Sequence, residues 1–444
     1  MRVNAAFCRL LRLEGVWVRG VAFDPDRVVV RVALRRRRLV CPSCSYSTRW
    51  IENTQAHESV WRHLDLGVWR LEVRATLRRL RCPTHGVHVE GVPFAREGSR
   101  FTADLEDLVT WLVTKCDRTA VCRLVRVDWQ TIGRIIERVG QEKLDPDRLD
   151  GLYEIGIDEV SWRKQHRYLT LVVDHRRGQV VWGTDGAGAV AADRFFAELD
   201  PPKSAPPRDP GAPPQLVIAG VDNEAGAAPQ VGERAAKIAA ISMDMGPGYA
   251  LSAREHAPHA VICIDPFHVV ALTTRALDEV RRGYWNELRS LDDKQAAKRF
   301  KDARWVLLKN PENLTEKQAA THRKLRDAGG DVWHAYTLKE ALRSIFNSEL
   351  EVEDVTVLLD EFITSATQSA LAPFVRLAQT IRKHREGILA AVRLGVNNAR
   401  VEALNNKVRL ITRRAYGFHS ARAALALVYL TCGPIDLTLP HEHD

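Results

Sequence analysis

The stretch from Tyr153 to Trp182, YEIGIDEVSWRKQHRYLTLVVDHRRGQVVW, decides the fold class. It contains three short runs rich in β-branched and aromatic residues, at 153–158, 168–173 and 179–182, and polar segments typical of turns separate them. This pattern predicts three strands in an antiparallel meander.

Beyond the meander, helical and strand patterns alternate. A helix is expected from Ala191 to Leu199, and apolar runs at 238–243 and 260–264 predict two further strands, so the expected fold class is α/β. The proline-rich segment 201–214 is expected to be a surface insertion or linker without regular structure.

The last third of the chain is helical in pattern. Residues 269–389 are rich in Lys, Arg, Glu, Leu and Ala and carry no strand pattern, which predicts an all-α insertion with a break at Asn310–Asn313. Helices at 398–414 and 420–430 are expected to close the chain.

The first hundred residues carry the positive charge of the chain. They contain 19 Arg, no Lys and 9 acidic residues, a net of +10, whereas the remainder has a net of −1 within the total of +9. Guanidinium groups match phosphate oxygens, so this module suits a nucleic-acid backbone. A solvated basic face is the alternative.

Two Cys/His pairs follow predicted strands in this region. Apolar residues alternate with mostly charged ones at 28–34 and 69–77, which is typical of half-buried strands. Each strand leads into one pair, and the four candidate ligands are Cys41, Cys44, Cys82 and His85. Such ligands suit a tetrahedral structural zinc, with unmetallated thiols as the alternative.

Between Thr102 and Gly140 the pattern becomes helical and predicts a helix-turn-helix, with Asp128 as the cap of the third helix. Four residues at the start of that helix are predicted to be exposed and to contact bases: Trp129, Gln130, Thr131 and Arg134. Three-helix packing without DNA binding is the alternative.

Three carboxylates are candidates for a magnesium site. Asp158 is expected to end the first strand of the meander, Asp244 follows the strand 238–243, and Glu402 lies in a helix with little other acid. Active sites collect at strand ends in open α/β sheets, and hard oxygen donors suit two Mg²⁺ ions. A cap or a surface charge is the commoner role for a single Asp.

The helix around Glu402 is otherwise cationic and rich in amides. The residues predicted to hold DNA backbone beside the metal are Asn405, Asn406, Lys407, Arg409, Arg413 and Arg414. A solvated helix face explains the charges but not the amides.

Composition excludes several classes of protein. The chain has 444 residues, 45% of them hydrophobic, and no apolar run of membrane-spanning length or secretory leader, so a cytoplasmic protein is expected. Eight cysteines are too few for a disulfide scaffold in a chain of this size.

Several strings in this order resemble the ISL-three family of bacterial insertion-sequence transposases, which are DDE transposases with a ribonuclease-H-like core. The matching strings are the Cys41 to Cys82 cluster, Val92-Pro93-Phe94-Ala95, Gly156-Ile157-Asp158-Glu159, Ser242-Met243-Asp244-Met245 with Tyr249, Asp265-Pro266-Phe267-His268, Leu307-Leu308-Lys309-Asn310, Glu402-Ala403-Leu404-Asn405-Asn406-Lys407 and Arg413-Arg414-Ala415-Tyr416-Gly417-Phe418. The resemblance covers nearly the whole chain.

The resemblance implies that Asp158, Asp244 and Glu402 form the DDE triad. Asp265 and His268 are then similar to an acidic-x-x-His motif in related transposases, where His268 would position a phosphate or brace the metal site; an ordinary polar residue at a helix start is the alternative. The implied activity is Mg²⁺-dependent strand cleavage and 3′-hydroxyl strand transfer, with binding of terminal inverted repeats and a dimer or larger assembly on DNA in the bacterial nucleoid.

Two departures from the family pattern stand out. Many relatives end the zinc cluster with cysteine where this chain has His85, so His88 or His63 remain alternatives for the fourth ligand. The proline-rich segment after Asp200 is also longer than usual in the family.

The expected organisation has five parts: a zinc module at 1–98, a helix-turn-helix at 99–145, the ribonuclease-H-like core at 146–268, the all-α insertion at 269–389, and the C-terminal core helices at 390–444. Two other functions remain open. One is a transposase-derived DNA-binding regulator without catalysis, and the other is a metal-dependent DNA nuclease.

Overall fold

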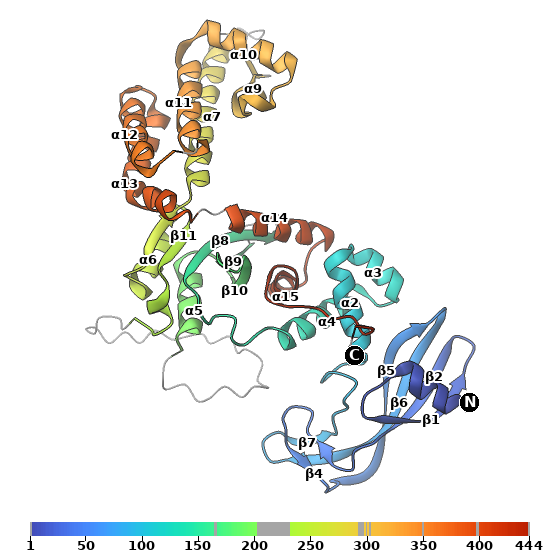
Figure 1. Ribbon diagram of the computed structural model, residues 1–444. Helices are drawn as coiled ribbons and strands as arrows, with labels where there is room; N and C mark the ends of the chain where they lie inside the picture. Colours follow the sequence, from blue (N-terminus) through green and yellow to red (C-terminus); the bar gives the residue numbers. More distant parts are fainter. Residues whose placement is uncertain are drawn as a thin grey trace. The chain divides into compact units, whose positions relative to one another are not determined.

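The computed structural model describes residues 2–163, 167–201, 231–291, 297–298, 300–301, 303–348, 350–396 and 399–442 (Figure 1). The described chain forms two compact units: residues up to Pro146 with those from Leu410 onward, and residues from Asp147 to Arg409. The proline-rich segment expected at 201–214 lies outside the described residues except for Pro201. No described helix is both long and apolar enough to cross a membrane.

The first unit begins with a β-rich module. A short helix α1 (Val3–Leu11) precedes a sheet in the order β1-β2-β6-β5, with β7 also paired to β6. The strands are β1 (Val16–Phe23), β2 (Arg27–Leu34), β5 (Asn53–Leu66), β6 (Trp69–Cys82) and β7 (Gly86–Val89), and β3 (Leu39–Val40) pairs with β4 (Ser47–Thr48). Alternate residues such as Val30 and Val73 are buried, which confirms the strand alternation predicted from sequence.

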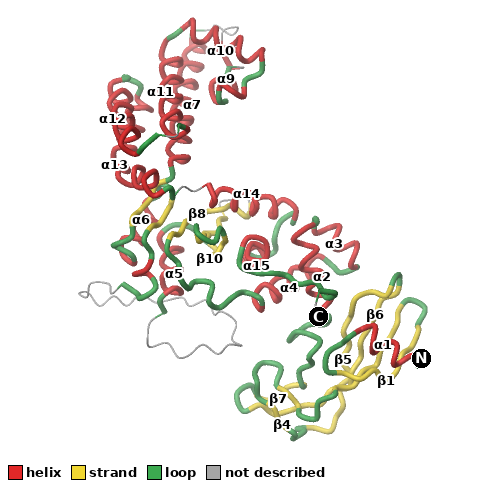
Figure 2. The backbone as a smooth tube through the Cα atoms, in the orientation of Figure 1, coloured by secondary structure: helices red, strands yellow, loops and turns green. Residues whose placement is uncertain are grey.

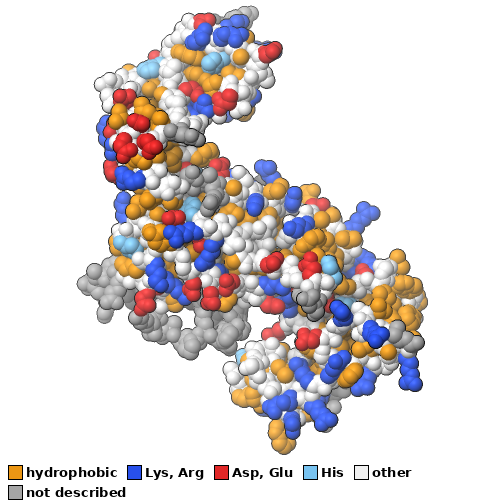
Figure 3. Space-filling view, viewed as in Figure 1, with side chains coloured by type: hydrophobic (Ala, Val, Ile, Leu, Met, Phe, Trp, Pro, Cys, Tyr) orange, Lys and Arg blue, Asp and Glu red, His pale blue; other side chains and the backbone are white. Residues whose placement is uncertain are grey.

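Basic side chains lie on the visible face of this module (Figure 3). Some are paired: Arg27 bonds to Glu72 at 2.6 Å, and Arg78 bonds to Glu90 at 2.8 Å. Others, such as Arg31 and Arg70, lie exposed on the strands. The sheet therefore presents some cations that are engaged with acids and others that are exposed to solvent.

The helix-turn-helix follows as α2 (Ala103–Lys115), α3 (Arg118–Val125) and α4 (Trp129–Glu142). The side chains of Thr102, Asp117 and Asp128 accept backbone N–H groups at the three N-termini, so the predicted cap on α4 is confirmed.

Helix α15 (Ala421–Cys432) packs on α4 in this unit, because Gly140 leaves room for Ala426; a Cβ at position 140 would lie 3.1 Å from the Cβ of Ala426. The sequence pattern assigns residues 390–444 to the catalytic core. In the structure, the boundary between the two compact units falls inside this segment, at Leu410.

The second unit contains a mixed sheet in the order β10-β9-β8-β11-β12. Its strands are β8 (Glu154–Arg163), β9 (Arg167–Asp174), β10 (Gln179–Asp185), β11 (Ala240–Met243) and β12 (Val261–Ile264). The first three form the predicted antiparallel meander, and β11 runs parallel to both β8 and β12. The α/β fold class expected from sequence is confirmed.

Helices α5 (Ala189–Leu199) and α6 (Pro247–His256) belong to the same unit. Ile155 and Ile157 of β8 are fully buried in one cluster with Phe195 of α5 and Tyr249 of α6. Because alternate residues of a strand face opposite sides, Gly156 and Asp158 face the other side of the sheet. That side receives α14 (Ala399–Arg414).

The all-α insertion is confirmed over the described residues. Its elements are α7 (Pro266–Ser290), α9 (Arg304–Leu308), the 3₁₀ turn η2 (Pro311–Asn313), α10 (Glu316–Ala328), α11 (Gly330–Asn347), α12 (Val352–Gln368) and α13 (Ala372–Leu394), seen as helices and loops in Figure 2. The expected break at Asn310–Asn313 is the η2 turn.

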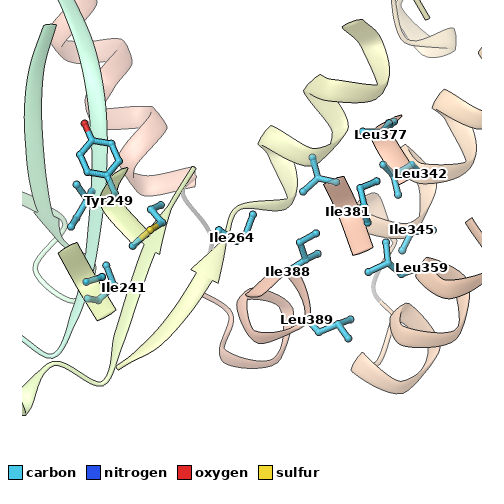
Figure 4. Packing of buried hydrophobic residues seen from close by; sticks show 14 of the residues in the cluster. Ile241, Tyr249, Ile264, Leu342, Ile345, Leu359, Leu377, Ile381, Ile388 and Leu389 are labelled. Atoms are coloured by element: carbon cyan, nitrogen blue, oxygen red, sulfur yellow. The ribbon is translucent and has the colours of Figure 1, made fainter. Parts of the chain in front are cut away.

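One buried cluster joins the insertion to the sheet. Figure 4 shows Ile264 of β12 facing Ile388 of α13, with Ile381, Leu342 and Leu359 continuing the packing into the helices. Gly387 permits this approach, since a Cβ there would lie 2.8 Å from Cγ1 of Ile264. The insertion is thus anchored on the edge of the sheet through α13.

Candidate active site

Asp158 of β8 and Asp244, the residue that follows β11, are brought level by the register of these two parallel strands. Ser242 of β11 pairs with Gly156 of β8, so two residues further along each chain Asp244 comes beside Asp158. Parallel strands lie about 4.8 Å apart, which places both carboxylates at the same edge. The register of Met243 with Ile264 likewise brings Asp265 to this edge.

The expectation that Asp158 ends its strand is wrong. β8 continues to Arg163 because it keeps pairing with β9, with Asp158 opposite Leu171. What ends near Asp158 is the parallel partner β11, at Met243. The carboxylate therefore lies at the end of the parallel ladder, on a strand that continues as half of a hairpin.

The pKa of Asp158 reflects its burial and the nearby carboxylate of Asp244. Burial raises the pKa of its carboxyl above the ordinary value, and the negative charge of Asp244 adds to the rise. The backbone N–H of Glu159, which donates to Oδ1 at 2.7 Å, opposes the shift, as do the charge of His268 and a hydrogen bond from Asn405. Two close carboxylates of this kind favour a bound cation.

Helix α14 reaches the edge through close packing on β8. Gly156 has no side chain, and a Cβ there would lie 2.6 Å from Cγ2 of Val401. One turn later, Nδ2 of Asn405 donates to Oδ2 of Asp158 at 2.6 Å. Glu402, half-buried, lies three residues before Asn405 and so shares its side of the helix.

The three carboxylates do not form a closed ligand set in this conformation. In the described chain, a group of three or more Cys, His, Asp or Glu ligand atoms all within 4.8 Å of one another is found only in the N-terminal module. Asp158, Asp244 and Glu402 are therefore not all within 4.8 Å of one another in this conformation.

The donor chemistry of the edge nevertheless fits magnesium. Its ligands would be hard oxygens, and Oδ1 of Asn405 is buried beside Asp158 with no hydrogen-bond partner among the described residues. An orphaned buried acceptor next to two carboxylates suits a hydrated cation, which brings its own donors.

Asp265 and His268 differ in their surroundings. Asp265 is buried and caps α7 by accepting from the N–H of Phe267 at 3.0 Å, so its carboxylate stabilises a helix start. His268, half-buried in the first turn of α7, lies near enough to Asp158 that its charge lowers the pKa of that carboxyl.

Sequence reasoning assigned no role to Glu159 or to the surroundings of Tyr249. Burial raises the pKa of Glu159, and the charges of Asp244 and Asp158 raise it further, whereas a hydrogen bond with Tyr249 opposes this. Tyr249 is buried, its hydroxyl lies 3.0 Å from Oγ1 of Thr170, and burial raises its pKa to about 12. The adjacent acids Asp158 and Glu159 were the sequence signal for this second polar group. Consecutive residues on a strand point to opposite faces of the sheet, so Glu159 points away from the face of Asp158.

The predicted metal cluster of the N-terminal module is assembled. Cys41, Cys44, Cys82 and His85 place their ligand atoms within 4.8 Å of one another. Nδ1 of His85 lies 3.6 Å from Sγ of Cys82 and 3.9 Å from Sγ of Cys41. Burial opposes ionisation of Cys82, but hydrogen bonds with His85 lower the pKa of its thiol to about 6, which suits a metal-binding thiolate.

This geometry selects His85 over the two alternative ligands. His63 is buried with Nδ1 2.8 Å from Oγ1 of Thr102, and burial lowers its pKa to about 4. Nε2 of His88 lies 2.6 Å from the backbone carbonyl of His85. Neither belongs to the group of four.

The predicted recognition residues divide into two kinds. Gln130 and Arg134 are exposed on α4, and Thr131 is half-buried. Trp129, predicted to be exposed, is half-buried because the guanidinium carbon of Arg118 lies 4.0 Å from its ring centroid and His419 packs edge-on. Trp129 thus braces the start of α4.

The predicted DNA-contacting residues of α14 also divide. Asn406, Lys407, Arg409, Arg413 and Arg414 are exposed. Asn405 is 1% exposed and bonded to Asp158, so it lies on the buried side of the helix, and the prediction that it contacts DNA backbone does not fit this placement.

Comparisons with known proteins bear on both units. A family model described as "Transposase" matches residues 155–206 and 227–427, a match that includes Asp158, Asp244 and Glu402. A model described as "Helix-turn-helix domain of transposase family ISL3" matches residues 90–140.

Two curated relatives align with most of the chain. The transposase for insertion sequence element IS1557 of Mycobacterium tuberculosis is 36% identical over 444 residues, covering 95% of this chain and 92% of the relative. The transposase for insertion sequence element IS1001 of Bordetella parapertussis is 28% identical over 399 residues, covering 89% of each.

Proposed function

Since this chain belongs to the ISL3 family of transposases, we propose that it binds the terminal inverted repeats of its element, cleaves DNA there and joins the freed 3′-hydroxyl to target DNA. The observation that carries the catalytic part is the register that sets Asp244 beside Asp158, with α14 bonded to Asp158 through Asn405. The sheet order β10-β9-β8-β11-β12 supports a ribonuclease-H-like core.

Asp158 and Asp244 would hold the catalytic metal ions, and Glu402 would complete the site. When bound, a pair of Mg²⁺ ions polarises the attacking oxygen and neutralises charge on the scissile phosphate. His268, near Asp158 in the first turn of α7, would add positive charge there when protonated. The attacking group is water in the cleavage step and the 3′-hydroxyl in the joining step, so the protein contributes placement and charge without a covalent intermediate.

The helix-turn-helix of the first unit recognises the bases of the DNA. Gln130 and Arg134, exposed at the start of α4, contact bases, while Thr131 lies beside them and Trp129 braces the helix. The exposed cations Lys407 and Arg409 of α14, followed by Arg413 and Arg414, hold backbone phosphates together with Asn406. Two element ends must be joined in one complex, so a homodimer or larger assembly forms on DNA in the nucleoid.

The Cys₃His cluster holds one structural zinc. Purified full-length protein is expected to contain one zinc per chain, and Cys82→Ser should lose most of it, because only three ligands remain. Elemental analysis and thermal melting measure this. Cys116→Ser, at an exposed cysteine outside the cluster, should keep the metal. Equal zinc in wild type and Cys82→Ser would refute the site.

The proposed activity is tested by incubating the full chain, Mg²⁺, DNA carrying the ends of its element, and a supercoiled target plasmid. Cleaved ends and joined products are expected, and pre-cleaved ends with a free 3′-hydroxyl should join without prior cleavage. Cleavage without joining indicates the nuclease. Binding to the ends without either product indicates the regulator, and each of these results overturns the proposal.

A further inference from the structure

Asn405 makes a contact that its sequence position does not suggest. Its side chain is 1% exposed, and Nδ2 donates to Oδ2 of Asp158 at 2.6 Å, which joins residues 247 positions apart. The next residue, Asn406, is exposed and accepts from Nη1 of Arg409 at 3.0 Å. Two adjacent amides on one helix therefore have different tasks.

With this contact, both carboxylate oxygens of Asp158 accept a hydrogen bond. Oδ1 accepts from the backbone N–H of Glu159 at 2.7 Å, and Oδ2 accepts from Asn405. A carboxylate oxygen has room for more than one partner, so each oxygen retains capacity for a cation. The two hydrogen bonds fix the rotation of the carboxylate.

The other end of the amide is unsatisfied. Oδ1 of Asn405 is buried and has no hydrogen-bond partner within the described parts of the chain. A buried acceptor left unpaired destabilises the folded protein. Its position beside Asp158 makes it an acceptor that the waters of a hydrated divalent cation can satisfy, since Mg²⁺ keeps several waters when bound.

We propose that Asn405 is the positioning residue of the metal site: it orients Asp158 through Nδ2 and offers Oδ1 to the hydration shell of the cation that Asp158 holds. This inference rests on the proposed function, and it assigns to α14 a second contribution besides Glu402. Removing partners of this kind from a metal ligand typically weakens metal affinity 10–100-fold, that is, by about one to two orders of magnitude.

The test uses full-length protein with Mn²⁺ as a spectroscopic probe. Asn405→Ala and the near-isosteric, uncharged Asn405→Leu both remove the amide donor, and each is expected to bind Mn²⁺ roughly 10–100-fold more weakly than wild type by electron paramagnetic resonance titration. Leu410→Ala, which trims an exposed side chain of the same helix, should bind as wild type does. Thermal melting identifies a variant that fails to fold. If Asn405→Ala does not fold, Asn405→Leu provides the test, because it nearly preserves the volume of the side chain.

A double-mutant cycle separates positioning from general support of the fold. In an Asp158→Asn background, Asn405→Ala should cause a clearly smaller loss of Mn²⁺ affinity than it causes alone, because the carboxylate that Nδ2 orients is gone. Full additivity, or wild-type Mn²⁺ affinity in the single variants, overturns the inference. If wild type joins DNA while the Asn405 variants bind Mn²⁺ normally, only this inference fails; if wild type neither binds Mn²⁺ nor cleaves, the proposed function fails with it.

Discussion

Replacing Asp158 by alanine is expected to lower Mg²⁺-dependent cleavage of element ends by at least about 10³-fold, because no other described carboxylate lies at this position on β8. The loss should appear equally in the joining step, since the same site serves both steps. DNA cleavage and joining assays on labelled element ends measure the two steps separately.

The matched control is Asp185→Ala. This aspartate is exposed at the end of β10, on the opposite edge of the sheet from β12, and should leave both steps unchanged. Asp158→Ala should still bind element ends in a mobility-shift assay, because the recognition helix belongs to the other unit. Cleavage retained by Asp158→Ala in the presence of Mg²⁺ would contradict the assignment of the triad.

Adding a single methyl group at Gly156 is expected to reduce activity almost as strongly. The Cβ of Gly156→Ala would meet Cγ2 of Val401 at 2.6 Å and two buried polar atoms, Nε2 of His175 and Oγ of Ser242, at 3.0 Å. Real structures do not tolerate the first distance, so α14 must move away from β8. A displacement near 1 Å at a catalytic group costs about 10²-fold in rate, and overpacking costs about 1–3 kcal/mol of stability.

Cleavage assays and thermal melting check this prediction. Gly283→Ala places the same methyl group in open space on α7 and should leave activity unchanged while slightly favouring the helix. The double variant Gly156→Ala with Val401→Ala removes the clashing atom and should recover part of the lost activity. A Gly156→Ala protein with wild-type rates would show that close docking of α14 is not required.

Local patterns were sufficient to predict most elements. Alternation around Val30 and Val73 indicated the strands of the first module, and Asp128 marked the start of α4. The paired spacing of Cys41 with Cys44 and of Cys82 with His85 indicated a cluster that the structure assembles. These features depend on neighbours within a few residues, which is the range over which periodicity and capping operate.

Features set by distant partners were missed. β8 extends past Asp158 because β9 continues to pair with it, and Trp129 is covered because Arg118 stacks on its ring. The side chain of Asn405 donates a hydrogen bond to Asp158, which lies on a strand 247 positions earlier. In each case the deciding contact comes from outside the local pattern, so tertiary packing overrides the exposure that helix periodicity suggests.

The candidate triad itself was not selected by spacing. Its assignment came from the resemblance of several strings, and the structure adds the register that sets Asp244 level with Asp158. The matching sequence strings could not show how the three carboxylates are arranged. In this conformation, Glu402 does not form a closed ligand set with the two aspartates.

The long interval between β8 and α14 has a consequence for synthesis. Both aspartates leave the ribosome well before Glu402 and Asn405, and the whole helical insertion is translated in between. Since domains generally fold in order as the nascent chain emerges, a half-made or prematurely terminated product would carry the strands without α14, the helix that packs on β8 and bonds to Asp158.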